Sequence, residues 1–470
     1  KKENKDKRIA IICYNYPPGE SNIFGGAFLD TFSSVENILK NLKDKGYKVN
    51  PLTKEELMGI FTAGGIVNSG KYSDSWEKMI KYPDKKYREE LKKSSDYEDI
   101  IKEWGPSPGS IMVNDNNEFL IPGIIEGNIF IGLQPTRGVH EEIEKVYHDK
   151  TLPPHHQYSG FYKWIKDEFK ADAIIHVGTH GTLEFLKGKE CGMSGNCYPD
   201  KLLSDIPHIY LYYCGNPSES TIAKRRSYAN IISYQPPVFV QGELYGEFAG
   251  LISMIDNYHQ SLSLAPQSSD DILSSIWELA EKLKMPKNLD NIEGELYRMK
   301  KSLIPKGLHI FGKGYTPEEA REYAKGLLRY NRNGILSIRE LITRANGCSL
   351  DALLDNDQYE TIREIDEEAE KIIDYYFENR KLKKSKYINE NNKDEFIKSL
   401  EYGCTIIESS QKNYEMEGLM RVLEGKYNPA KLAGDIYRHP EILPSGYNLY
   451  QFDPRLIPTK IAYKRGEKIC

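Results

Sequence analysis

The sequence predicts a mixed α/β (α+β, multidomain) protein, because two kinds of hydrophobic pattern share the chain. Short apolar runs rich in β-branched residues alternate with amphipathic helical stretches in the first half, whereas residues 270–382 have helical spacing almost throughout. The 470 residues are too many for one small domain. We expect an α/β region over 1–135, a central α/β region over 136–265, a helical insertion over 266–394 and a mixed C-terminal segment over 395–470.

The first predicted element is a strand over Ile9–Tyr14, an apolar run that leads into the turn Pro17-Pro18-Gly19. Ala27–Lys45 has apolar residues at helical spacing and stops before Gly46, a residue typical of helix ends. Tyr47–Leu52 reads as another strand. The chain therefore opens with a Rossmann-like βαβ unit.

The later elements follow from the same periodicities. Turn residues separate the strands, and prolines and glycines interrupt the helical part. In chain order we expect charged, mostly helical structure over 53–104, short strands over 110–133, an aromatic-rich helix over 158–169, buried strands over 173–177 and 208–213, a helix over 243–259 and a polar surface linker over 383–394.

The composition excludes several classes of function. The net charge is −5, from 64 basic and 69 acidic residues, so we expect no broad nucleic-acid surface. No apolar run of about 18 residues predicts a membrane span, and the charged start Lys1–Arg8 is not a signal peptide. Seven cysteines without a Cys-x-x-Cys pair favour the reducing cytoplasm. The missing initiator Met and the end at Cys470 indicate a piece of a longer protein.

Histidine is concentrated in one part of the chain, and neutral imidazole binds transition metals and carries protons near neutral pH. His176, His180 and Glu184 follow one another at four-residue spacing. We expect a strand that ends near Val177, a glycine turn and a short helix from Thr182 to carry them. The pattern favours a metal or proton-transfer site; hydrogen-bonded turn residues are the alternative. The other members of the cluster are His140, His148, His155 and His156.

Two stretches before this cluster carry candidate binding residues. Pro153-Pro154 fixes an extended approach to His155 and His156, of which we expect one to face the site, with a surface pair as the alternative. Arg137 lies in a turn after the expected strand 129–133. Its guanidinium suits a carboxylate ligand, although a loop salt bridge is the commoner use of such a residue.

Three consecutive cations, Lys224, Arg225 and Arg226, form the last candidate. They suit an anionic substrate, but on a helix they spread around the circumference and equally suit a solvated face. The chain lacks a phosphate-binding GxxxxGK[ST] loop, a GxGxxG turn after a strand, an HExxH pair and a GxSxG turn. We therefore expect it not to bind ATP or a dinucleotide by itself.

Collinear stretches of distinctive sequence cover nearly the whole chain: Tyr14–Glu20, Gly127-Asn128 through Gly138, Pro153–His156, Asp172–Glu184, Asn216-Pro217, Ala223–Arg226, Gly307–Gly312, Gly434-Asp435 and Pro444–Pro454. Together they closely resemble one family, the large subunits of cobaltochelatase (CobN type) and magnesium chelatase (its H subunit). Members of that family are much longer than this chain.

The resemblance implies a ligase that forms nitrogen–metal bonds, inserting Co²⁺ into a cobyrinic-acid-type macrocycle for cobalamin biosynthesis; Mg²⁺ and protoporphyrin IX are the alternative. It also implies AAA+ partner subunits that use the ATP. Two pyrrole N–H protons must leave as the metal enters, so a base within reach is required. Glu184 and His180 are expected to accept protons or hand over the metal, with His176 in support.

The same resemblance implies residues that bind the acidic side chains of the macrocycle and residues that line its flat face. The substrate-binding candidates are Arg137, His155, His156, Lys224, Arg225 and Arg226, and the candidate aromatic walls are Phe161, Trp164, Tyr212 and Tyr213. The sequence departs from the family pattern after Glu184, around Asn216-Pro217 and over 428–433, but the ligand-type residues are intact. Two alternatives stay open: a tetrapyrrole carrier or sensor without catalysis, and a metal-dependent hydrolase.

Overall fold

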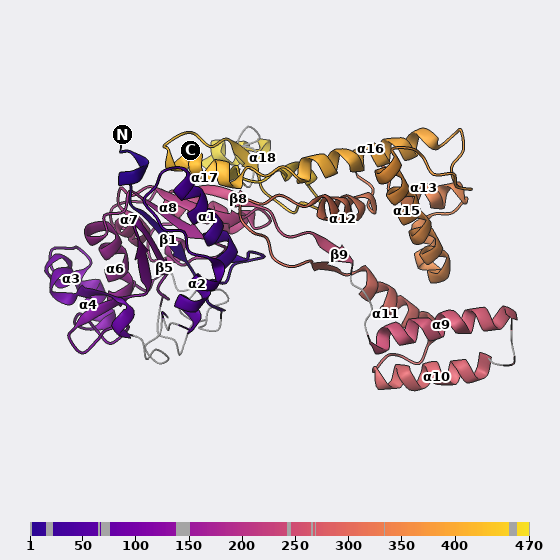
Figure 1. The fold of residues 1–470 in the computed structure, drawn as a ribbon, viewed down its shortest axis with the longest axis horizontal. Helices are drawn as coiled ribbons and strands as arrows, with labels where there is room; N and C mark the ends of the chain where they lie inside the picture. The colour runs from indigo at the N-terminus through magenta and orange to yellow at the C-terminus, as the bar shows by residue number, and fades with distance from the viewer. Residues whose placement is uncertain are drawn as a thin grey trace. The chain divides into compact units, whose positions relative to one another are not determined.

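The computed structural model describes residues 2–15, 22–63, 66, 76–137, 151–241, 246–264, 267, 269–332, 334–450 and 458–469. The candidates His140 and His148, and the motif residues 16–20, 138 and 452–454, lie outside the described residues. The chain forms two compact units (Figure 1). Unit 1 comprises Lys1–Pro236, Leu308–Gly314 and Lys412–Cys470, and unit 2 comprises Pro237–Gly307 and Tyr315–Gln411.

Unit 1 contains an eight-stranded sheet with the order β11-β12-β8-β7-β6-β1-β5-β4. The central strands β5, β1, β6, β7 and β8 run parallel, whereas β4 is antiparallel to β5 and β12 is antiparallel to β8. The strands of this sheet are β1 Ile9–Cys13, β4 Gly123–Glu126, β5 Ile129–Leu133, β6 Ala173–Val177, β7 His208–Tyr213, β8 Asn230–Tyr234, β11 Ala430–Leu432 and β12 Asn448–Tyr450; β2 Ile80–Pro83 and β3 Glu118–Ile121 form a separate antiparallel pair.

Helices cover both faces of the large sheet (Figure 1). Ile9, Ile11 and Cys13 of β1 pack with α1, α2 and α17 on one face, and Ala10 and Ile12 pack with α3, α4, α6 and α7 on the other. Strands buried on both faces are apolar throughout, which explains the continuous hydrophobic run at the start of the chain. The helices of unit 1 are α1 Thr31–Asp44, α2 Lys54–Met58, α3 Asp84–Leu91, α4 Tyr97–Trp104, α6 His156–Lys163, α7 Tyr198–Leu203, α8 Pro217–Ser227, α17 Glu415–Leu423 and α18 Lys460–Ile469.

The predicted strands over 9–14, 173–177 and 208–213 are confirmed, and so is the helix predicted within 27–45. The strand predicted over Tyr47–Leu52 is wrong, because these residues are irregular. Tyr47 and Val49 are apolar because they pack into the same core as α1. The Lys48 carbonyl accepts from the backbone N–H of Asn128, which ties this loop to the turn before β5.

The four expected regions do not coincide with the two compact units. The boundary at 135 separates β1 and β5 from β6, although β1 pairs with both of them in one sheet. The segment after 395 also contributes β11 and β12 to that sheet. Pairing between strands that are far apart in the sequence leaves no local signal, because a strand has the same hydrophobic pattern wherever its partner strand lies.

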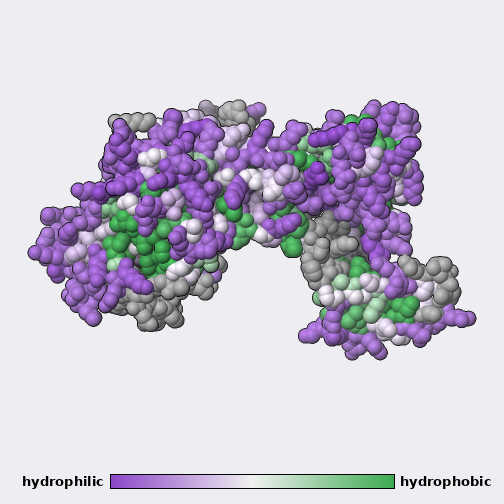
Figure 2. All heavy atoms as spheres, in the orientation of Figure 1, coloured by the Kyte–Doolittle hydropathy of each residue, from purple (hydrophilic) through white to green (hydrophobic). Residues whose placement is uncertain are grey.

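Unit 2 is mostly helical, as predicted for 266–394. Its helices α9, α10 and α11 pack around buried residues such as Leu251, Ile255 and Ile276, and α12 packs against α16. Figure 2 shows apolar side chains gathered over α9 and α10, and a mostly hydrophilic surface over α13, α15 and α16. The elements are β9 Phe239–Gln241, α9 Glu247–Leu264, α10 Ser269–Lys282, α11 Leu289–Lys301, β10 Leu303–Pro305, α12 Pro317–Leu328, α13 Ile338–Ala345, α14 Leu350–Asp355, α15 Tyr359–Asn379 and α16 Lys393–Ser410. In the part of the chain that the structure describes, no helix is both long and apolar enough to span a membrane.

Candidate functional site

The candidate residues follow the carboxyl end of β6, where open α/β sheets gather their binding sites. β6 ends at Val177, and Gly178 turns the chain with a φ of 91°, a left-handed conformation that favours glycine. A short 3-10 helix over Leu183–Phe185 then carries Glu184. The predicted order of strand, glycine turn and short helix is therefore confirmed.

Glu184 is fully buried, at 0% exposure. Burial raises the pKa of its carboxyl to about 7, because the charged form loses its hydration. The Tyr210 hydroxyl and the positive charges of Arg137 and Arg226 partly oppose this shift. A carboxyl that titrates near neutral pH suits proton transfer.

His180 lies closer to solvent than Glu184, with a side chain that is 11% exposed. Its Nδ1 pairs with the carboxylate of Glu219, and the Tyr212 hydroxyl lies 3.4 Å from the same nitrogen. Burial lowers the pKa of His180 to about 4, so the imidazole is neutral at neutral pH. A neutral imidazole beside a carboxylate carries its proton on the nitrogen that faces the carboxylate, which here is Nδ1.

His176 belongs to a different hydrogen-bond network. Its Nδ1 lies 2.7 Å from Nε2 of His208, and its Nε2 lies 2.9 Å from the Tyr162 hydroxyl. His208 in turn hydrogen-bonds through Nδ1 to the Ser227 carbonyl at 3.1 Å. Burial, together with His208, holds the pKa of His176 well below its usual range. His176 is therefore a neutral interior residue between two strands and a helix.

The expectation that His176, His180 and Glu184 share one metal site is not met by their side chains. Their surroundings differ: the first contacts His208 and Tyr162, the second contacts Glu219 and Tyr212, and the third is buried with neither carboxyl oxygen in a hydrogen bond. Among the described residues, no group of three or more His, Cys, Asp or Glu is arranged to hold a metal ion.

His155 and His156, predicted to bind substrate, are instead interior residues that are 1% and 2% exposed. His155 accepts from the Tyr158 backbone N–H, which caps α6, and its Nε2 bonds to the Thr136 carbonyl at 2.8 Å. His156 bonds through Nε2 to the Gly105 carbonyl at 2.9 Å. Both imidazoles are thus occupied by backbone groups. The bond from His155 to the Thr136 carbonyl holds the loop that carries Arg137, since Thr136 directly precedes Arg137.

The cations of α8 have three different environments. Arg226 is 1% exposed and donates to the Leu186 carbonyl and to Glu190, so it holds the segment after Glu184 rather than a substrate. Lys224 bonds to Asn448 and lies 4.0 Å from the centre of the Tyr450 ring. Burial lowers the pKa of Lys224 to about 8. Arg225 is 38% exposed and lies at the surface.

The aromatic candidates divide in the same way. Phe161 and Trp164 pack into the core around Phe130, which explains their apolar character without a ligand. Tyr212 is buried and serves the His180–Glu219 pair. Tyr213 is partly buried and packs edge-to-face on Phe28. Of the four, only Tyr213 is partly exposed; the other three are buried.

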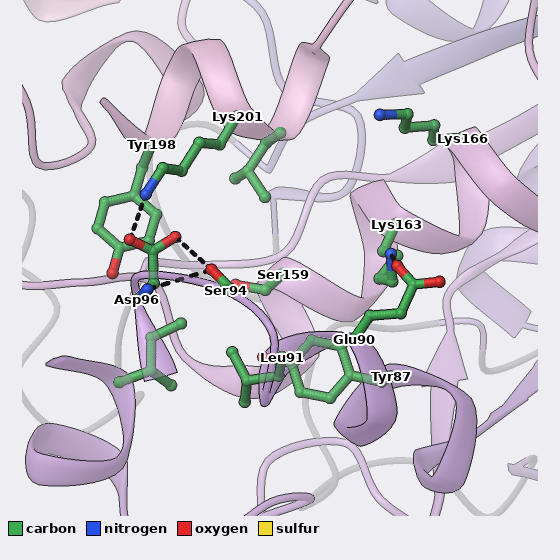
Figure 3. A pocket seen from close by; sticks show the side chains of 12 residues that line it. Tyr87, Glu90, Leu91, Ser94, Asp96, Ser159, Lys163, Lys166, Tyr198 and Lys201 are labelled. Atoms are coloured by element: carbon green, nitrogen blue, oxygen red, sulfur yellow. Dashed lines mark hydrogen bonds and ion pairs between the residues drawn. The ribbon is translucent and has the colours of Figure 1, made fainter. Parts of the chain in front are cut away.

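Unit 1 also has a pocket between α3, α4, α6 and α7 (Figure 3). Its volume is about 220 Å³, below the range of about 300–1,000 Å³ usual for small-molecule sites. Lys163 pairs with Glu90, and Lys201 pairs with Asp96, so these lining charges are largely balanced. Neither the volume nor the charge suits a large anionic macrocycle.

Three residues near the site, Glu219, Tyr210 and His208, were not predicted from the sequence. His208, Tyr210 and Tyr212 stand at alternate positions of β7, so their side chains lie on one face of the sheet. That face is the one covered by α6. Glu219 stands in the first turn of α8, after the helix start Asn216-Pro217. A signal existed for Glu219, because an acidic residue after a strand and a helix start lies at the same sheet edge as His180.

The family model for CobN/Magnesium Chelatase matches residues 1–470. The chain belongs to this family. It is 35% identical to an uncharacterized protein of Methanocaldococcus jannaschii over 100% of the chain and 40% of that protein. It is 32% identical to the magnesium-chelatase H subunit of Chlorobaculum parvum over 99% of the chain and 39% of that protein.

Among solved structures, the chain resembles the catalytic subunit of cobaltochelatase from Mycobacterium tuberculosis. The TM-score is 0.78 at 27% identity, and the match covers 99% of this chain and 41% of that one. The family expected from the sequence motifs is thus confirmed, together with its mixed α/β fold. The chain spans about 40% of the length of these relatives.

Proposed function

We propose that this CobN/magnesium-chelatase chain is the tetrapyrrole-binding, catalytic part of the large subunit of an ATP-dependent chelatase. The observation that supports the proposal is that two proton acceptors follow one another on the segment after β6. Glu184 titrates near pH 7 in the interior, and His180 presents a neutral imidazole nearer the surface. A ring that takes up a divalent metal releases two pyrrole protons, and these two groups supply an acceptor for each.

In this proposal His180 acts first, because its side chain is the more exposed of the two. Its Nε2 lone pair accepts a pyrrole proton or replaces a water on the incoming metal ion. Glu184 then accepts the second proton as its carboxylate. Arg137 and Arg226 keep part of the Glu184 population ionised at neutral pH by their charge. His176 supports this segment from within the core.

Acidic side chains of the macrocycle require cations at the rim. Arg225 and Lys224 on α8 are the proposed partners, and Tyr213 offers one aromatic face, whereas Arg137 after β5 is buried at 4% exposure and acts on Glu184. The AAA+ subunits, which hydrolyse ATP, are the proposed partners of the whole protein. The proposed compartment is the cytoplasm.

The comparisons include relatives that act on each metal, at similar identity: 32% to a magnesium-chelatase H subunit and 27% to a cobaltochelatase catalytic subunit. The fold resembles that of the cobaltochelatase subunit, which is consistent with Co²⁺ and a cobyrinic-acid-type ring. The sequence identity of 32% to a magnesium-chelatase H subunit supports Mg²⁺ and protoporphyrin IX. We propose cobalt as the substrate metal and magnesium as the second candidate.

The test is metal insertion by the full-length protein with its ATPase subunits, followed by the absorption change of the ring. We expect Co²⁺ insertion into a cobyrinic-acid-type ring and an at least tenfold slower reaction with Mg²⁺ and protoporphyrin IX. The reverse ratio would make magnesium the substrate. Tight ring binding without insertion of either metal would show a carrier and contradict the catalytic proposal.

A further inference from the structure

A buried chain of hydrogen bonds on the α6 side of the sheet ends at the segment that carries Glu184. We propose that Gln134 is a positioning residue, which holds this segment in place and is itself oriented by two buried histidines, His176 and His208. The inference rests on the proposed function of Glu184. No role was predicted for Gln134 from the sequence.

Glu184 depends on its own backbone for its position. It is fully buried, and among the residues that the structure describes neither of its carboxyl oxygens has a hydrogen-bond partner. A proton acceptor works only within hydrogen-bond reach of the proton, so the segment on either side of it has to be held. Arg226 holds the Leu186 carbonyl after Glu184. Gln134 holds Thr182, which precedes it.

The contact between Gln134 and Thr182 is direct. Thr182 caps the short helix that carries Glu184, and its backbone N–H donates to Oε1 of Gln134 at 2.9 Å. A Cβ at the neighbouring Gly181 would lie 3.2 Å from the same oxygen, so the loop approaches the amide closely. Gln134 and Thr182 are both 0% exposed, and water cannot replace this bond.

A glutamine amide can turn either its oxygen or its NH₂ group towards a neighbour, and only the oxygen accepts from a backbone N–H. The rest of the chain selects the orientation. Nε2 of Gln134 donates to the Tyr162 hydroxyl oxygen at 2.6 Å, and this hydroxyl lies 2.9 Å from Nε2 of His176. Nδ1 of His176 lies 2.7 Å from Nε2 of His208, whose Nδ1 lies 3.1 Å from the Ser227 carbonyl.

The direction of the chain is fixed at its far end, because the Ser227 carbonyl can only accept. Nδ1 of His208 therefore donates, and burial lowers the pKa of His208 to about 4, so its Nε2 carries a lone pair. His176, whose pKa is also held low by burial, donates to that lone pair from Nδ1 and accepts from the Tyr162 hydroxyl at Nε2. The tyrosine oxygen then accepts from an N–H, so the NH₂ group of Gln134 faces it.

The chain is enclosed along its whole length. Gln134 follows β5, Tyr162 lies on α6, the two histidines lie on β6 and β7, and Ser227 ends α8; each of the five is at most 6% exposed. Reversal of one bond would leave two buried donors, or two buried acceptors, facing each other. The orientation of the Gln134 amide is thus kept by a group as distant in the sequence as Ser227.

The first experiment compares variants of Gln134 in the full-length protein with its ATPase subunits. Gln134→Met fills the space but cannot accept from the Thr182 N–H. We expect it to lower kcat for metal insertion about 10–100-fold, without a change in the dissociation constant of the tetrapyrrole. Gln134→Glu keeps the acceptor and should recover part of kcat. His208→Leu removes an acceptor at the far end of the chain and should also lower kcat.

The matched control is Gln157→Met. Gln157 is a second buried glutamine, 2% exposed, whose amide donates to the Leu120 carbonyl on the same side of the sheet. We expect this variant to lose stability in thermal unfolding, as Gln134→Met does, and to keep the wild-type kcat. An equal fall of kcat in both variants would show that any buried glutamine has this effect and would overturn the inference.

Two further measurements do not need turnover. In protein labelled with ¹⁵N-histidine, the signals of His176 and His208 are those missing from His176→Gln and His208→Leu, and we expect the Nδ1–H tautomer for both. Hydrogen exchange at the Thr182 amide should be faster in Gln134→Met than in the unmodified protein. An Nε2–H tautomer at either histidine, equal exchange at Thr182, or wild-type kcat in Gln134→Met would overturn the inference.

Failure of the proposed function gives a different result. Absence of insertion by the unmodified protein would contradict that function alone. The tautomers of His176 and His208 and the exchange at Thr182 would still decide whether Gln134 is oriented by the chain and holds the Glu184 segment.

Discussion

The imidazole of His309 donates from Nε2 to the buried carboxylate of Glu415 at 2.8 Å. The same carboxylate accepts from the backbone N–H of Gly312 at 2.7 Å and of Gln235 at 3.0 Å, and from the hydroxyl of Ser445. Gln235, His309, Gly312 and Glu415 each lie within a few residues of a point where the chain passes between the two units. The Glu415 carboxylate thus holds together, within unit 1, the segments next to all four points where the chain leaves or enters this unit.

Replacement of Glu415 by alanine should destabilise unit 1 strongly. The change leaves several buried donors without an acceptor, and we expect a loss of about 3–5 kcal/mol in the free energy of unfolding. Denaturant unfolding followed by circular dichroism measures it. Glu417→Ala, two residues along the same helix but exposed, should cost less than about 0.5 kcal/mol. Equal effects of the two changes would refute a special role for Glu415.

Glu184 predicts an unusual dependence of stability on pH. Its folded pKa of about 7 lies above the unfolded value of 4.5, so between these pH values the folded state binds more protons than the unfolded state. Stability is therefore lost as the pH rises from about 4.5 to 7. The full loss, about 3 kcal/mol, persists above pH 7.

Glu184→Gln removes this titration. We expect the variant to approach wild-type stability near pH 4.5 and to exceed it by up to about 3 kcal/mol at pH 8, measured by denaturant unfolding at both pH values. A constant difference between the two proteins would show that Glu184 ionises normally. The variant should also lose the rise of metal insertion with pH around 7, because that rise reflects formation of the carboxylate.

Arg226 and Arg225 are neighbours in sequence with opposite expected roles. Arg226→Ala removes the donor to the Leu186 carbonyl, so we expect lower stability and slower insertion, with tetrapyrrole affinity unchanged. Arg225→Ala should leave stability within about 0.5 kcal/mol and weaken tetrapyrrole binding. Fluorescence titration with the ring and thermal unfolding separate the two effects. A larger affinity loss from Arg226→Ala would restore Arg226 as a substrate contact.

The imidazole of His155 should act through the helix that it caps. His155→Ala removes the acceptor for the Tyr158 N–H and the donor to Thr136, and we expect a loss of about 1–2 kcal/mol in stability. His155→Asn keeps a capping acceptor and should recover about half of this loss. Thermal unfolding of the two variants measures the difference. No difference between them would contradict the capping role.

The family, the central strands and the site's place in the sheet could be predicted from the sequence. Periodicity reveals β6 and β7 because their residues are buried on both faces, and the glycine turn after Val177 is a local feature. Burial of a histidine is not local. His155 and His176 have the same residue type as His180, and only the packing of distant segments decides which imidazole is enclosed.

The run of three positive charges on α8 likewise predicted the roles of its residues only in part. Lys224, Arg225 and Arg226 are consecutive, but a helix turns each residue by about 100°, so one enters the interior, one lies over a tyrosine ring and one stays at the surface. Glu219 was not selected because a single acidic residue on a helix is common. The role of Glu219 depends on its contact with His180, which lies in a different loop.

The insertion of unit 2 within unit 1 constrains the order of events during synthesis on the ribosome. Lys7 bonds to the Leu423 carbonyl, and β8 pairs with β12 more than two hundred residues later. The six strands β1, β4, β5, β6, β7 and β8 are therefore synthesised first, and β8 stays an open edge while the whole helical unit emerges. An open edge of this kind recruits other strands, so nascent chains that stall before residue 412 should depend on chaperones, whereas unit 2 completes its own contacts without waiting.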